Sequence, residues 1–311
     1  MGNYSIRVLE KIIVLFVVMI AGYIAKKTKI CDGKNTKYMS SLLANITNPC
    51  LILATLQTER TPEKLKTAFY IILLSLAIHS TVAIASWIIF RKNKNPRRRS
   101  VYSFAMTYMN CGFMGYPIMM AIFGNEDGLF YGVIYTVIFN LFCWTHGVLI
   151  MDTEKKNGID WKKMFNPCII SLITSVILYV TNIRLPIVLY DGIDMIGNMT
   201  FPLSMLIIGS LLADMKLKDI LKDVNMYLFS LGKLIVLPLI FLIIAYLTRM
   251  PQLYALIGLT MCCTPTATNT AVLAEIYGNE SQLAAKIVGV TTLLCIATMP
   301  FMLMLSQYVI K

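Results

Sequence analysis

Apolar runs of membrane-spanning length follow one another along almost the whole chain. They lie at 8–26, 38–57, 67–90, 101–123, 129–151, 165–183, 192–213, 225–248, 252–277 and 283–308. A helix needs about 20 apolar residues to cross the ~30 Å hydrocarbon core of a bilayer, and each run is close to that length. Because the loops between the runs are short, no soluble domain fits. The sequence therefore predicts an all-α polytopic membrane protein with ten transmembrane helices.

The composition agrees with a surface that faces lipid. Hydrophobic residues make up 57% of the chain and charged residues 14%, whereas soluble domains carry about 25% charge. The first run ends in Lys26 and Lys27 with no small-residue cleavage site behind it, so we expect a retained span and not a signal peptide. The two histidines are far apart in the sequence, and we expect neither a metal site nor a cofactor.

The net charge of +12 is concentrated in loops on one side of the predicted membrane. Lysine and arginine are most frequent after the odd-numbered runs, and most densely so in KNKNPRRR at 92–99. Under the positive-inside rule these loops lie in the cytoplasm and both termini lie outside a cytoplasmic membrane. The basic loops then act as topology signals that also touch anionic lipid headgroups. No nucleic-acid partner is expected.

The chain repeats itself once. Two motifs recur at almost the same separation: NITNP at 45–49 with NMTFP at 198–202, and FGNE at 123–126 with YGNE at 277–280. Each half, 1–154 and 155–311, then holds five runs, and an odd number turns the second half upside down in the membrane. Inverted repeats of this kind are common among secondary transporters. The alternative is that such short strings recur by chance in an apolar sequence.

The fourth and ninth runs contain helix breakers near their centres. In the fourth run, Asn110, Gly112, Gly115 and Pro117 follow about ten residues, or ~15 Å, of helix. The ninth run is interrupted at a similar depth by TPTATNT at 264–270. Such paired interruptions are the best sequence pointer to the substrate site of a transporter. A simple proline kink would be the alternative for either run alone.

The two breaks predict a binding site for an anion. Each break begins a half-helix inside the membrane, and the free N–H groups and positive dipole end there favour negative charge. The substrate-binding residues that we expect at the breaks are Asn110, Cys111, Gly112, Gly115, Pro117, Pro265, Thr266, Thr268, Asn269 and Thr270. Asn45 and Asn48 of the second run either line the same cavity or form interhelical hydrogen bonds.

Three ionisable residues inside the predicted spans are candidates for charge compensation or coupling. Lys233 either balances an anionic substrate or extends its ammonium group to the cytoplasmic interface. Glu275, near the cytoplasmic end of the ninth run, either carries a coupling proton or lies at the interface. His79 either relays protons or is a structural residue.

Five segments carry a resemblance to a known family. They are NCGFMGYPIMMAIFG at 110–124, NPCIISLI at 166–173, FPLSMLIIGSLLA at 201–213, KLIVLP at 233–238 and TPTATNTAVLAEIYGNESQLAAKIV at 264–288. In this order and spacing they resemble the auxin efflux carrier family, which includes bacterial malate permeases. The resemblance implies two inverted five-helix repeats, as in bile-acid and sodium/proton carriers, with helices 4 and 9 crossing at their breaks. A transport bundle of helices 3–5 and 8–10 would move like an elevator against a scaffold of helices 1, 2, 6 and 7.

Family substrates are mainly organic anions, namely malate-like dicarboxylates in bacteria and indole-3-acetate in plants. We therefore expect a secondary carrier of a small malate-like anion, with proton coupling as a hypothesis and a homodimer as one option for its assembly. A sodium-coupled carrier of the same fold is the nearest alternative, although the ninth run lacks an acidic cluster. A non-transporting receptor and an intramembrane enzyme are the alternatives from other classes. The long central loop of some plant members is absent.

Overall fold

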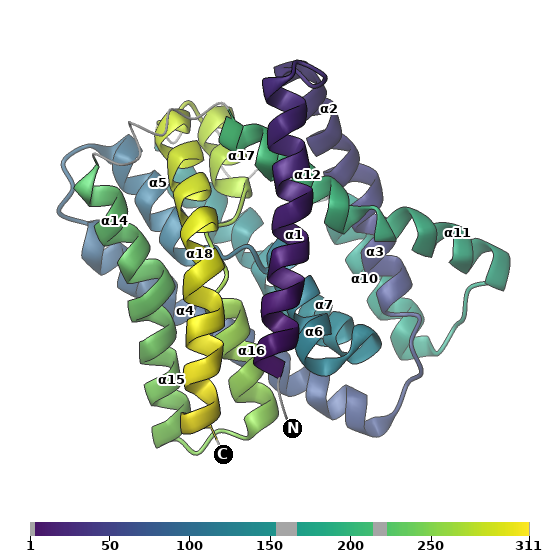
Figure 1. The fold of residues 1–311 in the computed structure, drawn as a ribbon. Coiled ribbons are helices and arrows are strands. Elements are labelled where there is room, and N and C mark those ends of the chain that lie inside the picture. Colours follow the sequence, from purple (N-terminus) through teal and green to yellow (C-terminus); the bar gives the residue numbers. More distant parts are fainter. Residues whose placement is uncertain (1–3, 154–166, 214–222, 311) are drawn as a thin grey trace.

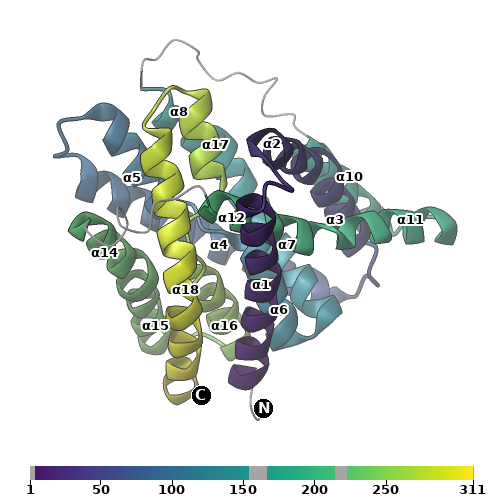
Figure 2. The ribbon, with the colours of Figure 1, turned by 45° about the horizontal axis from the view of Figure 1, so that its top comes forward.

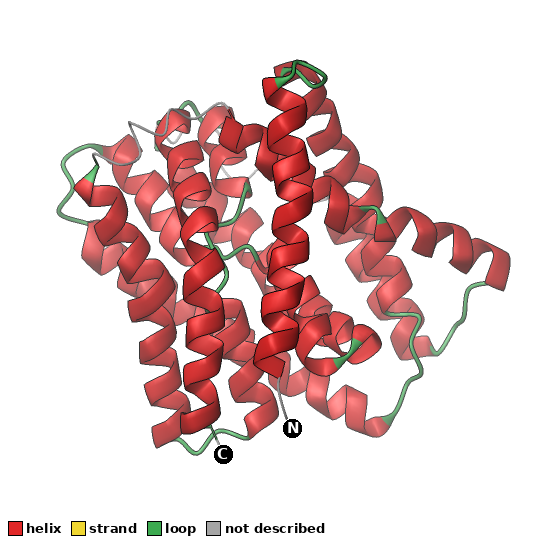
Figure 3. Ribbon diagram, in the orientation of Figure 1, coloured by secondary structure: helices red, strands yellow, loops and turns green. Residues whose placement is uncertain are grey.

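The computed structural model describes residues 4–153, 167–213 and 223–310, and all the regular elements in these ranges are helices, joined by short loops (Figures 1 and 3). Their only β-type pairing is one isolated bridge between Met109 and Thr266. The prediction of an all-α protein is therefore confirmed. The predicted boundary between the halves, at 154–155, lies outside the described residues.

The first part of the chain forms eleven helical elements, in which η marks a π-helical turn. They are α1 (Tyr4–Lys27), α2 (Gly33–Leu42), η1 (Leu43–Thr47), α3 (Asn48–Thr55), α4 (Pro62–Phe90), α5 (Pro96–Thr107), η2 (Cys111–Gly115), α6 (Tyr116–Phe123), α7 (Asn125–Phe142), η3 (Cys143–Gly147) and α8 (Val148–Met151). Each η turn continues directly into the helix that follows it.

The rest of the described chain continues in the same way. Its elements are α10 (Pro167–Thr181), α11 (Ile187–Asn198), α12 (Thr200–Ala213), α14 (Val224–Leu231), η4 (Gly232–Val236), α15 (Leu237–Leu247), α16 (Gln252–Cys262), α17 (Asn269–Ile276) and α18 (Ser281–Val309).

Five continuous helical stretches are long and apolar enough to cross a membrane. They are Pro62–Phe90, Asn125–Met151, Ile187–Ala213, Val224–Leu247 and Ser281–Val309. Shorter apolar helices lie at Cys111–Phe123, Pro167–Thr181 and Gln252–Cys262. The protein is thus a multi-pass membrane protein. The fourth and ninth predicted runs are interrupted, because α5 is separated from η2–α6 and α16 is separated from α17.

Local sequence signals set the starts of α4 and α5. Asn95 caps α5 by accepting hydrogen bonds from the N–H groups of Arg97 and Arg98, and Pro96 occupies the first helical position. Thr61 caps α4 in the same way, with Pro62 behind it. Proline suits this position because its missing N–H group would have no helical partner there. These caps fix where both helices enter the structure.

Helices α1 and α18 lie next to each other, and both chain ends lie at the same end of the molecule (Figures 1 and 2). On its other side, α1 packs backbone to backbone against α12. A Cβ atom at Gly22 would lie 2.2 Å from the carbonyl oxygen of Leu206, and one at Gly209 would lie 1.9 Å from that of Met19. Small residues allow this close approach between helices inside a membrane.

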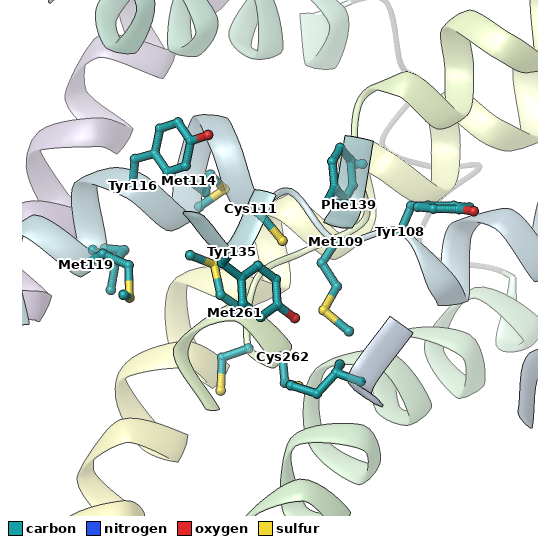
Figure 4. Close-up of a cluster of buried hydrophobic side chains, with 14 of the residues drawn as sticks. Tyr108, Met109, Cys111, Met114, Tyr116, Met119, Tyr135, Phe139, Met261 and Cys262 are labelled. Carbon is teal, nitrogen blue, oxygen red and sulfur yellow. The ribbon is translucent and has the colours of Figure 1, made fainter. Parts of the chain in front are cut away.

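The outer surface remains apolar. Val17, Ile84 and Trp87 are each about 60% exposed, as expected for side chains that meet lipid. The interior is packed around the two breaks, where side chains of both broken helices gather in one cluster that includes Cys111, Met114, Met261 and Cys262 (Figure 4).

Candidate functional site

The two breaks lie against each other and exchange backbone hydrogen bonds. The N–H group of Asn110 donates to the carbonyl oxygen of Pro265 at 2.8 Å, and that of Ala267 donates to the carbonyl oxygen of Tyr108 at 3.0 Å. The two extended segments run antiparallel. Irregular backbone is tolerated at membrane depth only where such partners satisfy it. We call this contact the crossover.

Side chains from the second half hold the carbonyl end of α5. The Thr266 hydroxyl donates to the carbonyl oxygen of Ala105 at 3.1 Å. The Lys233 ammonium donates to that of Met106 at 2.6 Å. A positive charge is favoured at this end of a helix dipole. Lys233 is 0% exposed, so the alternative in which it extends to the interface is wrong.

Local, uncharged groups hold the carbonyl end of α16. The Thr264 hydroxyl donates to the carbonyl oxygen of Met261 at 2.7 Å. The Cys295 thiol lies 3.4 Å from the carbonyl oxygen of Cys263. A thiol is a weak donor. The second break therefore depends on its own loop and on α18.

A cavity of about 180 Å³ lies beside the crossover, and we call it the central cavity. Its lining comes from η1–α3, both breaks, α6, α7, η3 and the start of α10. The lining residues are Ala44, Asn45, Asn48, Met109, Asn110, Cys111, Gly112, Phe113, Tyr116, Thr136, Phe139, Asn140, Trp144, Pro167, Cys168, Ala267, Thr268 and Asn269. No residue of this lining carries a charge.

Asn110 offers an unpaired donor at the cavity wall. Its side-chain oxygen caps η2 by accepting from the N–H group of Phe113 at 3.3 Å. Its amide nitrogen has no hydrogen-bond partner among the described residues, although the side chain is only 3% exposed. Buried polar atoms are rarely left unpaired, so such an atom at a cavity points to a ligand.

Four further asparagines face the same cavity with weak or local partners. The amide nitrogen of Asn48 lies 3.3 Å from the Cys168 sulfur, and that of Asn269 lies 3.9 Å from the Cys143 sulfur. Asn45 and Asn140 donate to carbonyl oxygens of their own helices. Each amide keeps hydrogen-bonding capacity for a ligand.

The structure divides the predicted crossover residues into two groups. Asn110, Cys111, Gly112, Thr268 and Asn269 line the central cavity, as do Asn45 and Asn48 from the second run. The residues that build the crossover and do not line the cavity are Gly115, Pro117, Pro265, Thr266 and Thr270.

The three ionisable candidates do not line the cavity. Lys233 lies at the end of α5, and Glu275 is exposed near the end of α17. His79 is 0% exposed, with its Nδ1 atom 2.8 Å from the carbonyl oxygen of Ser75. In the described ranges, no group of three or more His, Cys, Asp or Glu side chains is arranged to hold a metal ion.

Several lining residues escaped the sequence reasoning. Thr136, Asn140 and Trp144 lie four residues apart in the fifth run, and the Thr136 hydroxyl lies 2.6 Å from that of Tyr116. Polar residues at this spacing share one face of a helix, and that periodicity was the available signal. They were missed because their run contains no breaker.

The fold and the crossover describe a multi-pass membrane protein with a small cavity beside two interrupted helices. The chain belongs to the membrane transport protein family, the family of auxin efflux carriers, whose model matches residues 7–160 and 157–303. Membership implies a small-molecule substrate that is carried across a membrane.

Relatives with transporter names cover nearly the whole chain. A protein of Rhizobium meliloti (strain 1021) named "Putative malonate transporter" is 22% identical over 306 residues, which cover 94% of this chain and 93% of the relative. An uncharacterized transporter of Methanothermobacter thermautotrophicus is 23% identical, with 94% and 96% covered. One of Methanocaldococcus jannaschii is 24% identical, with 91% and 94% covered.

Proposed function

We propose that the protein is a secondary active transporter of a small organic anion, with malonate and malate as first candidates. The observation that carries the proposal is the unpaired amide nitrogen of Asn110 at a cavity from which two half-helices begin. Neutral donors and positive helix ends favour a carboxylate over a cation. The relative named for malonate, a dicarboxylate, agrees with this substrate class.

The size of the central cavity supports a small ligand. Its volume of about 180 Å³ lies below the roughly 300–1,000 Å³ typical of sites for drug-sized molecules. A dicarboxylate of three or four carbons suits this space better than the bicyclic indole-3-acetate.

The proposed mechanism is alternating access by two inverted repeats, 1–154 and 155–311, with ten transmembrane helices. The antiparallel crossover and the two chain ends at one end of the molecule support it. The transport bundle of predicted helices 3–5 and 8–10 moves against the scaffold of helices 1, 2, 6 and 7. The protein resides in a cytoplasmic membrane with both termini outside, and it performs no chemistry on its substrate.

Proton coupling is favoured over sodium coupling. Transporters commonly hold sodium with the backbone carbonyls of unwound helices, and at the crossover the carbonyl oxygens of Tyr108 and Pro265 already accept backbone hydrogen bonds. The carbonyl end of α5, which would attract a cation, already holds the Lys233 ammonium.

Uptake of labelled malonate and malate into proteoliposomes tests the proposal. Asn110→Ala should abolish most uptake, whereas Asn198→Ala should leave it unchanged. Asn198 is a matched control because it is exposed and bonds Asp194 at 2.9 Å, away from the cavity. Binding without uptake would indicate a receptor. Full uptake by Asn110→Ala would contradict the proposed site.

A further inference from the structure

A second, larger cavity lies between α4, α5 and the end of the α7–α8 helix. Its volume is about 740 Å³, and we call it the His146 cavity. Several hydroxyl groups face it. Its polar and charged lining residues are Ser80, Ser86, Arg99, Ser100, Ser103, His146, Asp152 and Thr153. Apolar side chains such as Ile84, Trp87 and Leu149 complete the lining, and the polar groups among them provide partners for water molecules.

The hydrogen bonds of His146 determine which of its ring nitrogens is free to bind a proton. The Tyr108 hydroxyl lies 2.8 Å from the carbonyl oxygen of Phe142 and 3.0 Å from Nδ1 of His146. A carbonyl oxygen can only accept, and a hydroxyl has only one hydrogen to donate. Tyr108 therefore donates to Phe142 and accepts from Nδ1–H of His146. The lone pair of His146 is then on Nε2, and the side chain lines the His146 cavity, which is large enough to admit water.

His79 lacks this access. Its Nδ1 atom faces the Ser75 carbonyl oxygen, which again can only accept, so Nδ1 carries the hydrogen. Its Nε2 atom is buried without a partner, and the rings of Tyr108, Tyr135 and Phe139 surround it. A proton that reached His79 would create a charge in an enclosed aromatic pocket, which is costly.

His146 is also connected to the crossover and lies close in the sequence to a residue of the central cavity. Tyr108, its hydrogen-bond partner, accepts the crossover bond from Ala267 and caps the carbonyl end of α5. Trp144, two residues earlier on the same turn, lines the central cavity. An imidazolium ion near the carbonyl end of a helix is favoured by the dipole.

We propose that His146 is the residue that carries the coupling proton, an inference that rests on the proposed anion transport. A proton from water in the His146 cavity binds the Nε2 lone pair, and Nδ1–H keeps its bond to Tyr108. The imidazolium then offsets the negative charge of an anion in the neighbouring central cavity. The proton leaves Nε2 for water when the anion is released.

Other charged and titratable groups determine the electrostatic potential at His146. Tyr108 bonds His146 directly, and Arg99 and Asp152 line the same cavity. The neighbouring helices also carry His79, Tyr135, Cys143 and Glu275, together with charged groups nearer their ends. Arg99 and Asp152 have opposite charges and partly cancel. Since neither tyrosine nor thiol is ionised near neutral pH, histidine is the group with an ordinary pKa in that range.

Accumulation of labelled malonate in proteoliposomes under an inward proton gradient tests this role, with the membrane potential held at zero. A gradient of one pH unit should drive about tenfold accumulation by the unaltered protein. His146→Gln, whose amide can still donate to Tyr108, should reduce this to about onefold. Exchange of labelled for unlabelled malonate at equal pH should persist. His79→Gln is the matched control and should keep gradient-driven accumulation.

Several results would overturn the proposal. One is gradient-driven accumulation by His146→Gln equal to that of the unaltered protein, and another is a parallel loss of exchange, which would indicate a structural role. If the unaltered protein exchanges malonate but ignores the gradient, the coupling role fails and the carrier proposal stands. If it does not exchange any carboxylate, both fail.

A second variant tests the orientation of the ring. Tyr108→Phe removes the acceptor of Nδ1–H, so the midpoint of the uptake–pH profile should move while accumulation at low pH persists. An unchanged profile would contradict the assigned orientation.

Discussion

The two broken helices share the same helix–break–helix arrangement of the backbone, but different groups satisfy the hydrogen bonds at the two breaks. At the first break, the carbonyl end of α5 is held by Thr266 and by the Lys233 ammonium, both from the second half of the chain. At the second break, the carbonyl end of α16 is held by the hydroxyl of its own neighbour Thr264. The carbonyl end of α5 thus depends on a charge and a hydroxyl from distant residues, whereas the second break depends on its own loop and on uncharged groups of α18, namely the Thr291 hydroxyl and the Cys295 thiol.

The helix starts differ as well. Asn110 caps η2 with its side chain and keeps an unpaired amide nitrogen, whereas α17 begins at Asn269 without a side-chain cap from Thr268. The repeated backbone arrangement therefore does not imply that the two breaks contribute equally to ligand binding. We infer that the first break contributes most of the directional hydrogen bonding to the anion and that the second contributes mainly shape and the dipole of α17.

The largest expected effect is on anion affinity. Asn110→Ala removes a buried donor and a cap, and a hydrogen bond to a charged group contributes about 1.5–3 kcal/mol, or at least about tenfold in affinity. Asn269→Ala removes an amide whose nearest partner is a thiol at 3.9 Å, so the loss should be only a few-fold. Titration calorimetry with malonate measures both. A greater loss at Asn269 would reverse the proposed division of roles.

The next effect is on the stability of the crossover. Thr266→Val removes the bond to Ala105 and should lower the free energy of unfolding by about 1–3 kcal/mol. Thr270→Val is the matched control, because the buried Thr270 hydroxyl has no partner among the described residues. Its removal should be neutral or stabilising. Thermal unfolding in detergent compares the two, and equal destabilisation would argue against the crossover bond.

Two glycines of η2 should respond differently to an added methyl group. A Cβ atom at Gly115 would lie 2.9 Å from the Met261 sulfur of the second broken helix. Because that side chain is flexible, Gly115→Ala should cost about 1 kcal/mol. At Gly112 the nearest atom, in Tyr116, is 4.0 Å away. Gly112→Ala should therefore change stability by less than about 0.5 kcal/mol, and should weaken malonate binding because its methyl group enters the cavity. Normal binding by Gly112→Ala would place the ligand elsewhere.

The smallest effect is the pH dependence of an ion pair that ties the second-half helices together. Asp223, just before α14, lies 3.0 Å from the Lys286 ammonium of α18, and this bond lowers the pKa of the Asp223 carboxyl below its ordinary value. The pair's stabilisation is present above the ordinary carboxyl pKa and is lost as pH falls through the lowered pKa.

Partial exposure limits this contribution to about 1 kcal/mol or less. Asp223→Asn should therefore lower the melting temperature slightly at pH 7, and its curve should meet that of the unaltered protein in acid. A constant difference across the whole pH range would contradict the ion-pair explanation.

Breakers and apolar length were enough to locate both interruptions in the sequence. They also led to Asn110 and Asn269, since polar residues at a break tend to face a cavity. The sequence could not show which side of each break faces the ligand. Thr266 and Thr270 were therefore expected in the site. In the structure, however, Thr266 bonds the backbone of α5, and Thr270 is fully buried and does not line the central cavity.

The distance of a residue from the end of its helix also failed to predict what its side chain contacts. Lys233 lies near enough to a helix end for its ammonium to reach the interface, yet its side chain turns inward to a carbonyl that only the folded crossover exposes. His146 drew no attention because its run has no breaker, and its importance depends on contacts with Tyr108 from another helix.

The most direct test of the central claim is a crystal structure with a bromine-substituted dicarboxylate, because the anomalous signal of bromine locates the ligand without a mutation. The account predicts one peak in the central cavity, beside Asn110 and the first turn of α17. A peak only in the His146 cavity or on the lipid-facing surface, under conditions in which the dicarboxylate binds, would contradict it.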